Sequence, residues 1–356
     1  MPLTEFLRRQ GLTLVLIVIV VVGLLLQRER QPVVDGSIHE LTGRTMGTTY
    51  SVKLVDMPQQ MPAQQLAETI GAALTRLDRE LMSTYSADSE LSRLNRAPIN
   101  TVLPLSAEMT EVLALAQQLS ERTGGAFDVT VGPLVNRWGF GPQAVDDAPG
   151  QPEIDALLAS VGYQKLQLDV QAATLTKTGE VYIDLSGIAK GYAVDQVAGL
   201  LDSLDVESYF IEVGGELRIK GYKPGNESWV PAIEKPVDDA PEVHEIFYAR
   251  GEAIAVAGSG DYRNYFELGG VRYSHEIDPA TGRPVRHNLA AVYVIAPSAA
   301  AADAWATAFM VLGADKGYVL AEREQLAVYF ITRSSSGEGF DERYTAGFEH
   351  YLSPAR

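Results

Sequence analysis

Four segments of the chain place apolar side chains every three or four positions, which is the spacing of an amphipathic helix. The first segment begins at Pro62, a residue that suits the first turn of a helix. The other three begin at residues that are favoured as helix N-caps, namely Ser106, Ser186 and Ser298. We therefore predict helices that start at these four positions, the last of them rich in alanine and ending before Gly313.

Short apolar or alternating runs between these helices predict strands. They span residues 165–168, 174–176, 209–213, 229–233, 253–257, 290–295 and 326–332, and a further helix is expected at 315–322. Helices and many short strands follow one another in mixed order without an internal repeat, which favours an α+β fold over a doubly wound parallel sheet. The expected fold class is α+β, with mixed or antiparallel sheets and packed helices.

The most apolar stretch is Leu12–Leu26, in which only Thr13 and Gly23 interrupt large aliphatic side chains. With its neighbours it approaches the minimum length of a membrane-spanning helix. Almost every side of such a helix would be aliphatic, which disfavours a buried core helix, and no small-x-small cleavage site follows. We predict a transmembrane anchor or uncleaved signal over residues 1–30, followed by a linker at 31–41.

Composition excludes several classes of function. The formal net charge is −17, which argues against binding to nucleic acid. The chain has no cysteine, so disulfides, thiolate metal sites, cysteine nucleophiles and cysteine-linked lipids are excluded. Hydrophobic residues make up 46% of the chain and charged residues 21%, as in globular proteins.

The segment Tyr182–Asp195 reads Y-I-D-L-S-G-I-A-K-G-Y-A-V-D and joins a predicted strand end to a predicted helix. Gly187 and Gly191 flank Lys190, so a cation and backbone amides with little side-chain bulk meet in the first turn. A helix N-terminus of this kind favours an anion such as a phosphate. The alternative is an ordinary strand–loop–helix joint with a solvated lysine, and the segment carries no P-loop motif.

Asp303 and Thr307 lie four positions apart in the predicted alanine-rich helix and therefore share one face. A carboxylate and a hydroxyl one turn apart suit Mg²⁺, because this hard cation prefers oxygen ligands. The alternative is a local hydrogen bond between the two side chains in a tightly packed helix of small residues. Spacing alone favours that alternative.

A polar, glycine-rich region spans residues 258–288 and contains a predicted turn, Asp-Pro-Ala-Thr-Gly, at 278–282. His275 stands at the end of a predicted strand just before this turn. An imidazole titrates near neutral pH, so His275 is a candidate acid–base group. The alternative is a structural histidine, which is the more common role for a lone one.

Separated motifs follow one another along the chain: R-T-M-G-T at 44–48, S-T-Y-S at 83–86, T-G-G-A-F-D-V-T at 123–130, the segment 182–195, V-G-G-E-L-R at 213–218, S-G-D-Y-R at 259–263, H-E-I-D-P-A-T-G at 275–282, and Asp303 with Thr307. By these motifs and their order, the chain resembles the ApbE family of flavin transferases. The resemblance implies an ApbE-like architecture, related to the T-fold, for a catalytic domain at 42–335 followed by a C-terminal tail at 336–356.

Carried over position by position, the resemblance implies a site for FAD and a site for Mg²⁺. The FAD site would be lined by Met46, Tyr85, Ala126, Phe127, Asp128, Asp184, Lys190 and Ile277. The metal would be held by the carbonyl of Gly187 together with Asp303 and Thr307. The chain departs from the family in lacking the cysteine that anchors many members as lipoproteins, and in carrying Glu212 where an asparagine is common.

The resemblance implies an enzyme that transfers the FMN moiety of FAD to a threonine hydroxyl of a target protein through a phosphodiester bond. AMP would leave, and the reaction would depend on Mg²⁺. His275 is the first candidate for the base and Asp278 the second, while Lys190 would bind phosphate oxygens. Water in place of threonine would give an Mg²⁺-dependent FAD pyrophosphatase. A flavin-binding protein without catalysis is the third alternative, which Asp303 and His275 argue against.

The expected partner is an acceptor flavoprotein subunit that carries a threonine acceptor motif of the Asp-x-x-Thr type, as the resemblance suggests for respiratory electron-transfer complexes. With the predicted N-terminal anchor, the protein is expected at the bacterial inner membrane with its catalytic domain facing the periplasm.

Overall fold

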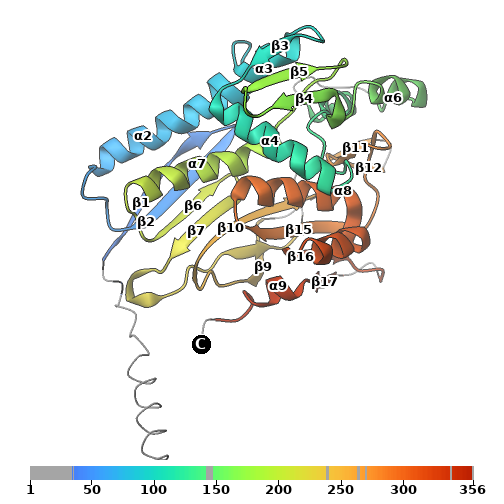
Figure 1. The fold of residues 1–356 in the computed structure, drawn as a ribbon. Coiled ribbons are helices and arrows are strands. Elements are labelled where there is room, and N and C mark those ends of the chain that lie inside the picture. Colours follow the sequence, from blue (N-terminus) through green and yellow to red (C-terminus); the bar gives the residue numbers. More distant parts are fainter. Residues whose placement is uncertain are drawn as a thin grey trace, which may run out of the picture.

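The centre of the fold is an eight-stranded antiparallel sheet (Figure 1). The computed structural model describes residues 34, 36–141, 147–237, 240–262, 265–268, 271–336 and 339–354. Neighbouring strands of the sheet all pair antiparallel. In spatial order they are β1 (Ile38–Thr45), β2 (Thr48–Val55), β6 (Tyr209–Val213), β7 (Glu216–Gly221), β10 (Gly251–Gly260), β15 (Leu289–Ala296), β16 (Ala327–Arg333) and β17 (Phe340–Tyr344).

Four helices cover one face of this sheet (Figure 1). They are α2 (Ala63–Thr75), which continues as a π-helical turn at Arg76–Met82, α4 (Ala107–Arg122), α7 (Ala189–Ser203) and α8 (Ala299–Arg323). Their apolar stripes and the inward side chains of β2 and β6 form the larger core of the molecule. Burial of this face is the main source of stability, because apolar area removed from water contributes roughly 25 cal/mol per Å². The expected α+β class with antiparallel sheets is confirmed.

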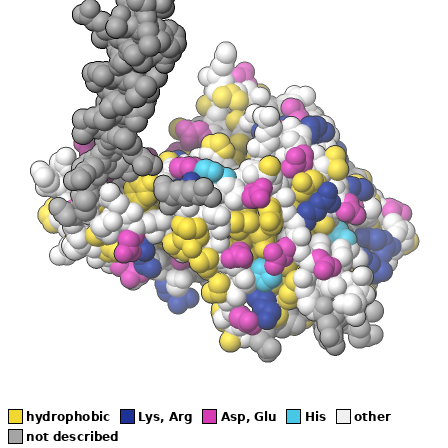
Figure 2. Space-filling view, turned by 90° about the horizontal axis from the view of Figure 1, so that it is seen from below, with side chains coloured by type: hydrophobic (Ala, Val, Ile, Leu, Met, Phe, Trp, Pro, Cys, Tyr) yellow, Lys and Arg dark blue, Asp and Glu magenta, His cyan; other side chains and the backbone are white. Residues whose placement is uncertain are grey.

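A smaller core lies against the opposite face of the sheet. It is built around Trp229, Ile233, Phe247 and Phe348. Ile233 lies in β8 (Ala232–Glu234), Trp229 precedes this strand, Phe247 follows its partner β9 (Val243–Ile246), and Phe348 lies in α9 (Ala346–Glu349). On the surface seen from below, basic side chains are scattered among acidic ones rather than gathered in one patch (Figure 2).

The remaining elements frame one end of the main sheet. The helices are α3 (Glu90–Arg96), α5 (Gly132–Val135), which continues as a turn at Asn136–Phe140, and α6 (Gln151–Leu158), with 3-10 turns at Tyr163–Lys165 and Pro224–Asn226. The strands are β3 (Val102–Pro104), β4 (Leu166–Asp169) and β5 (Thr174–Lys177) in one small sheet, then β11 (Tyr265–Leu268) with β12 (Val271–Ser274), and β13 (Ile277–Asp278) with β14 (Arg283–Pro284).

Helix α8 differs from the prediction by running past Gly313. The predicted helix that ends before Gly313 and the predicted helix at 315–322 are the two halves of one element, Ala299–Arg323. Gly313 breaks the helical path between the halves with φ 77° and ψ 170°, a conformation that favours glycine. A Cβ at this position would also lie 2.8 Å from the ring of His287. The glycine therefore marks a break, as predicted, but the chain resumes a helix directly after it.

The start of α7 also differs from the prediction. Ser186 was expected to cap the helix, but α7 begins at Ala189, and Ser186 lies in the turn before it. The backbone N–H of Ser186 instead donates a hydrogen bond of 2.8 Å to Oδ1 of Asp184. By contrast, Ser106 and Ser298 cap α4 and α8 as predicted, since their hydroxyls accept from the N–H groups of Met109 and Ala301.

The folded part extends beyond the expected domain bounds of 42–335 at both ends. Strand β1 begins at Ile38, inside the expected linker, and pairs with β2 along its whole length. Strand β17 and helix α9 lie inside the expected tail, and the side chain of Phe348 is fully buried in the smaller core. The start of β1 and the segment 339–349 therefore belong to the folded domain, because β1 and β17 pair with the main sheet and Phe348 is buried in the smaller core.

The predicted fold class included an N-terminal membrane helix, and this part of the prediction is wrong. Within the described ranges, none of the helices combines the length and the apolar character needed to cross a bilayer. The run Leu12–Leu26, on which that prediction rested, lies outside these ranges. Over the described residues, the fold class is therefore α+β, and no membrane-spanning helix forms part of it.

Candidate active site

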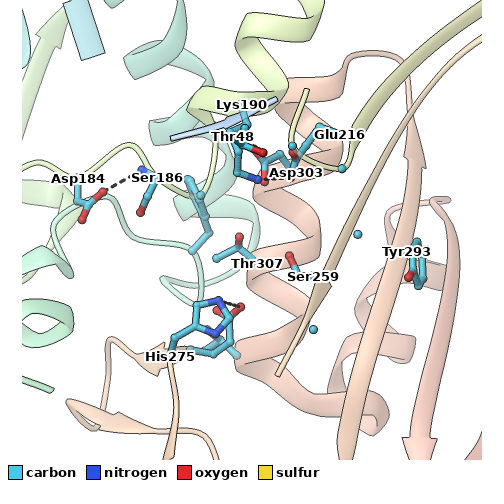
Figure 3. A pocket seen from close by; sticks show the side chains of 18 of the residues that line it. Thr48, Asp184, Ser186, Lys190, Glu216, Ser259, His275, Tyr293, Asp303 and Thr307 are labelled. Carbon is cyan, nitrogen blue, oxygen red and sulfur yellow. Dashed lines mark hydrogen bonds and ion pairs between the residues drawn. The ribbon is translucent and has the colours of Figure 1, made fainter. Parts of the chain in front are cut away.

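A cavity of about 800 Å³ brings together most of the predicted site residues (Figure 3). It lies at the end of the main sheet, where the turn between β6 and β7 and the last residues of β10 meet the first turns of α7 and α8. Ten predicted residues line it: Ala126, Phe127, Asp128, Asp184, Gly187, Lys190, His275, Ile277, Asp303 and Thr307. Segments that are more than a hundred residues apart in the sequence thus meet in one place.

The two helices that carry the predicted phosphate and metal groups are locked together at their N-termini. A Cβ on Gly191 would lie 2.2 Å from the carbonyl oxygen of Ala299, so glycine allows this close approach. The carboxylate of Asp195 in α7 accepts hydrogen bonds of 2.9 Å from the N–H groups of Ala299 and Ala300 in α8. Asp195 therefore caps a helix other than its own.

The three predicted metal ligands line the cavity beside this packing contact. A Cβ on Gly187 would lie 3.1 Å from Oγ1 of Thr307, so the glycine backbone and the hydroxyl face each other closely. Oδ2 of Asp303 accepts a hydrogen bond of 3.1 Å from the N–H of Gly191, and the residue is 4% exposed. Burial raises the pKa of Asp303, against the lowering effect of Lys190.

The chemistry of this donor set fits Mg²⁺. A backbone carbonyl, a hydroxyl and a buried carboxylate are hard oxygen donors, which is the type of ligand that Mg²⁺ takes. Among the residues that the structure describes, no group of three or more His, Asp or Glu side chains is arranged to hold a metal ion. The predicted site does not require one, because it uses a single carboxylate.

Lys190 forms an ion pair with Glu216 at the start of β7 (Figure 3). Burial alone would lower the pKa of Lys190, but the carboxylates of Asp303 and Glu216 outweigh it and raise the pKa. Burial raises the pKa of Glu216, and the charge of Asp303 raises it further. The second oxygen, Oε2 of Glu216, is buried and has no hydrogen-bond partner. Lys190 is thus the cation that faces two buried carboxylates, Glu216 and Asp303.

His275 enters the cavity from the segment between β12 and β13 (Figure 3). Its Nε2 lies 3.2 Å from Oε1 of Glu276, and its ring is in edge contact with that of Phe140 at 6.1 Å between centroids. Glu276 is 7% exposed and also lines the cavity. Burial raises the pKa of Glu276, and the neighbouring His275 lowers it.

Asp128 and Asp184 line the cavity but also hold the local backbone. Asp128 accepts hydrogen bonds from the N–H and hydroxyl of Thr130, at 2.8 and 2.6 Å, and from the N–H of Tyr163 at 2.9 Å. Burial raises the pKa of Asp128, against the lowering effect of the Thr130 hydrogen bonds. The N–H of Asp184 donates to the carbonyl of Val129 at 2.7 Å, which joins the two predicted FAD segments.

Three predicted site residues are not among those that line the cavity. Met46 occupies a turn at φ 48°, where its N–H donates to Asp78 at 3.2 Å. Tyr85 is 75% exposed. The carboxylate of Asp278 accepts from the N–H of Ala280 and the hydroxyl of Thr281, so it stabilises the predicted turn. Their roles toward FAD and the transferred proton stay predictions.

The cavity also has residues that sequence reasoning did not assign to the site. Glu216 and Glu276 stand inside the motifs V-G-G-E-L-R and H-E-I-D, but their burial depends on packing between distant segments. A second group lies toward the opposite face of the sheet and includes Tyr262 and Tyr293, whose hydroxyl accepts from the N–H of Glu234 at 2.9 Å. The residue that departs from the family pattern, Glu212, accepts from the N–H of Gly215 at 2.8 Å and so stabilises the β6–β7 turn.

Comparison with known proteins agrees with this geometry. The model of the ApbE family matches residues 46–330. An FAD:protein FMN transferase of Haemophilus influenzae is 45% identical over 309 residues, which cover 85% of this chain and 89% of the relative. One of Vibrio cholerae is 44% identical over 315 residues, which cover 88% and 92%. The structure of the flavin transferase ApbE from Vibrio cholerae superposes with a TM-score of 0.80 at 41% identity, covering 89% of this chain and 99% of that one.

Fold, cavity and relatives thus define the class of protein as a flavin transferase. The chain belongs to the ApbE family. The resemblance inferred from the sequence and the expected enzyme class are confirmed, and the similarity of the solved structures confirms an ApbE-like α+β fold.

Proposed function

We propose that this chain transfers the FMN moiety of FAD to a threonine hydroxyl of a target protein and releases AMP in an Mg²⁺-dependent reaction. The observation that carries this proposal is the meeting of Gly187, Asp303 and Thr307 with Lys190 and His275 in one cavity. The relatives named FAD:protein FMN transferase support FAD as the substrate and a protein as the acceptor.

The first turn of α7 would bind the pyrophosphate of FAD. The N–H groups of Ala189 and Gly191 already donate to Leu185 and Asp303, so the helix would act through its dipole. Lys190 adds an ammonium whose raised pKa keeps it charged. Gly187, Asp303 and Thr307 would hold Mg²⁺. The ion would supply charge neutralisation at the phosphate oxygens, the usual role of a divalent metal in phosphoryl transfer.

The reaction forms one bond and breaks one. The threonine oxygen bonds to the phosphorus of the FMN half, the bond from this phosphorus to the bridging oxygen breaks, and AMP leaves with that oxygen. His275 would accept the proton of the threonine hydroxyl, because its ring reaches the cavity beside the phosphate-binding turn. The flavin is not oxidised or reduced, so it acts as a transferred group.

Six of the eight residues predicted to bind FAD line the cavity, the exceptions being Met46 and Tyr85. Phe127 and Ile277 offer apolar surfaces, both less than 5% exposed, that suit a flat ring system. The acceptor would be a flavoprotein subunit with a threonine acceptor motif. A location on the periplasmic side stays a prediction.

The test uses the full-length chain, FAD, Mg²⁺ and a candidate acceptor domain, with the acceptor mass as the readout. A mass gain equal to one FMN residue that disappears on chelation supports the proposal. The variant Asp303→Ala should lose the adduct, whereas Asp315→Ala should retain it, because Asp315 is an exposed residue of the same helix.

Other outcomes would overturn the proposal in different ways. Free FMN and AMP without an adduct on any of several acceptors would favour the FAD pyrophosphatase, in which water takes the place of the threonine. Intact FAD under all of these conditions would leave a flavin-binding protein.

A further inference from the structure

Strand β10 extends further into the cavity than its neighbour β7. Pairing between the two strands reaches only as far as Leu217 and Val256, because β7 begins at Glu216, directly after the turn from β6. Strand β10 continues beyond this point, and its last residues, Gly258–Gly260, line the cavity. Over this extension, β15 is the one strand within the described residues that pairs with β10. The other edge of the extension therefore has no neighbouring strand in this part of the chain.

The register with β15 determines which backbone groups point to this open edge. In an antiparallel ladder, alternate residues direct both N–H and C=O to one neighbour, and the residues between them direct theirs to the other side. The N–H of Asp261 donates to the carbonyl of Ala290 at 3.1 Å, so Ser259, two positions earlier, also points its backbone groups to β15. Those of Gly258 and Gly260 point to the open edge, and none of the turn, loop or side-chain hydrogen bonds among the described residues engages them.

The open edge is accessible from the cavity. Gly258 is exposed, and Ser259 and Gly260 are half-buried, whereas the four residues before them are buried. A Cβ on Gly258 would lie 2.7 Å from the ring of Tyr293, and one on Gly260 would lie 2.4 Å from the ring of Tyr262. A glycine inside a strand often marks a place where another backbone approaches closely. Unpaired backbone donors and acceptors of this kind accept an extended peptide as a further strand.

The two faces of the extension open to different parts of the cavity (Figure 3). Ala255 and Ala257 belong to the core beneath the helices. Because side chains alternate along a strand, Ser259 points to the same face, which α8 covers with Asp303. A residue opposite Ser259 on an added strand would share this face. The residues on either side of it would point to the other face, toward Tyr293.

We propose that the acceptor polypeptide binds along this edge as an extended strand, antiparallel to β10, with its threonine opposite Ser259. This inference rests on the proposed function, because it gives the second substrate of that transfer its place. The antiparallel direction follows the pairing throughout the main sheet. In this register the hydroxyl would lie on the face that carries Asp303 and Lys190, the groups assigned to the metal and the phosphate.

The edge is separate from the residues assigned to FAD. Those that line the cavity come from positions 126–128, 184, 190 and 277, and none comes from β10. Pairing with Gly258 and Gly260 would use backbone groups of the acceptor, so it would tolerate different side chains around the threonine.

Hydrogen exchange tests the pairing without relying on turnover. The full-length chain is mixed with an acceptor domain whose threonine is replaced by valine, at a concentration that inhibits transfer to the unchanged acceptor. Exchange is then measured residue by residue by mass spectrometry. The amides of Gly258 and Gly260 should exchange about tenfold more slowly with this acceptor present. The amide of Ser259, which already faces β15, should not change, and FAD alone should leave all three unchanged.

A pair of substitutions at Gly258 gives a kinetic readout. Gly258→Pro removes the N–H that points to the open edge, and Gly258→Ala is the matched control, because it adds a Cβ beside Tyr293 but keeps the N–H. The KM for the acceptor should be about 3- to 10-fold higher in Gly258→Pro than in Gly258→Ala, the usual effect of one hydrogen bond. The Kd for FAD should be the same in both. Thermal unfolding shows whether both variants fold, and if Gly258→Pro does not, the exchange experiment decides.

The outcomes separate this inference from the proposed function. A wild type that forms no FMN adduct on any acceptor would overturn the proposed function. An adduct that forms while exchange at Gly258 and Gly260 stays unchanged would overturn the acceptor site alone. Slower exchange with FAD instead of the acceptor would assign the edge to FAD, and it too would overturn this inference.

Discussion

Two clusters of ionisable side chains meet in the cavity, and they stand on different kinds of structural element. Lys190, Glu216 and Asp303 stand on α7, β7 and α8, in the layer where helices cover the sheet. His275 and Glu276 stand on the short segment that joins β12 to the two-residue strand β13. The carboxylates are the buried members, with the Glu216 side chain 3% and the Glu276 side chain 9% exposed, whereas that of Lys190 is 32% and that of His275 29% exposed. The comparison indicates that different elements build the same arrangement, a buried carboxylate beside a more accessible nitrogen base.

Each group solves the problem of a buried carboxylate differently. Around Lys190, one ammonium faces two buried carboxylates, and their charges raise its pKa. Around His275, one buried carboxylate oxygen lies 3.2 Å from one imidazole nitrogen. Four substitutions can break or sharpen this comparison.

The largest effect is expected from Lys190→Met. It removes the ammonium and leaves Glu216 and Asp303 buried without their cation, which should cost about 3–5 kcal/mol of unfolding free energy. Denaturant unfolding measures this loss, and the transfer assay should show no adduct. The exposed Lys316→Met of α8 is the control and should stay within about 0.5 kcal/mol of the wild type. A fully stable Lys190→Met would show that the buried carboxylates are protonated or solvated.

A smaller loss is expected from Gly191→Ala. The added methyl would lie 2.2 Å from the carbonyl oxygen of Ala299, so α7 and α8 must separate, at a cost of about 1–3 kcal/mol. The same change at Gly199, on the same helix, meets no atom within 4 Å and should stabilise the protein by about 0.5–1 kcal/mol. Thermal unfolding of both variants gives the two signs. Equal effects at the two positions would contradict the close packing of the helices.

The pH dependence of stability should distinguish Glu276→Gln from the wild type. Burial raises the pKa of Glu276 above its ordinary 4.5, so the folded state binds more protons than the unfolded state above that pH. The unfolding free energy of the wild type therefore falls as pH rises from about 4.5 toward the raised value, by at most about 1.4 kcal/mol per pH unit. The variant lacks this fall, so it should gain stability relative to the wild type as pH rises above about 4.5.

Urea unfolding at several pH values measures this difference. Glu349→Gln, on the exposed side of α9, should show no pH-dependent difference from the wild type. A constant difference between Glu276→Gln and the wild type would mean that Glu276 has the same proton affinity in both states.

The smallest effect is expected from Tyr85→Ala. This ring is 75% exposed and lies outside the cavity lining, so it can add at most a stacking contact at the rim. Loss of one aromatic stack is worth about 1 kcal/mol, or roughly a fivefold rise in the Kd for FAD. Fluorescence titration with FAD measures it, and unfolding free energy should not change. A loss of affinity above a hundredfold would place Tyr85 inside the flavin site.

Sequence patterns within one helix predicted the helices of the site better than they predicted its buried charged residues. Ser106 and Ser298 were identified as helix caps because a cap depends on residues three positions apart. Ser186 is not a cap, because α7 begins three residues later, and its N–H donates to the carboxylate of Asp184. The pairing of Asp303 and Thr307 followed from helix periodicity, and Gly187 reached them through the family resemblance.

The remaining parts could not be predicted because they depend on contacts between distant segments. The order of the main sheet places β2 beside β6, more than 150 residues further along the chain. Glu216 and Glu276 look like ordinary polar residues in the sequence, and their burial arises only when β7, α8 and the segment before β13 pack together. Likewise, β17 is a strand because it pairs with β16, not because of its own composition.

The cap that Asp195 provides across two helices has a consequence for protein design. A metal-binding helix such as α8 is an attractive part to transplant, because Asp303 and Thr307 are close in sequence. In this protein, however, the first turn of that helix is completed by a side chain that lies 104 positions upstream of Ala299. A graft of α8 alone would carry the ligands but lose the start of the helix that orients them. The smallest transferable unit is therefore the pair of helices, with the Gly191 crossing that lets Asp195 reach its neighbour.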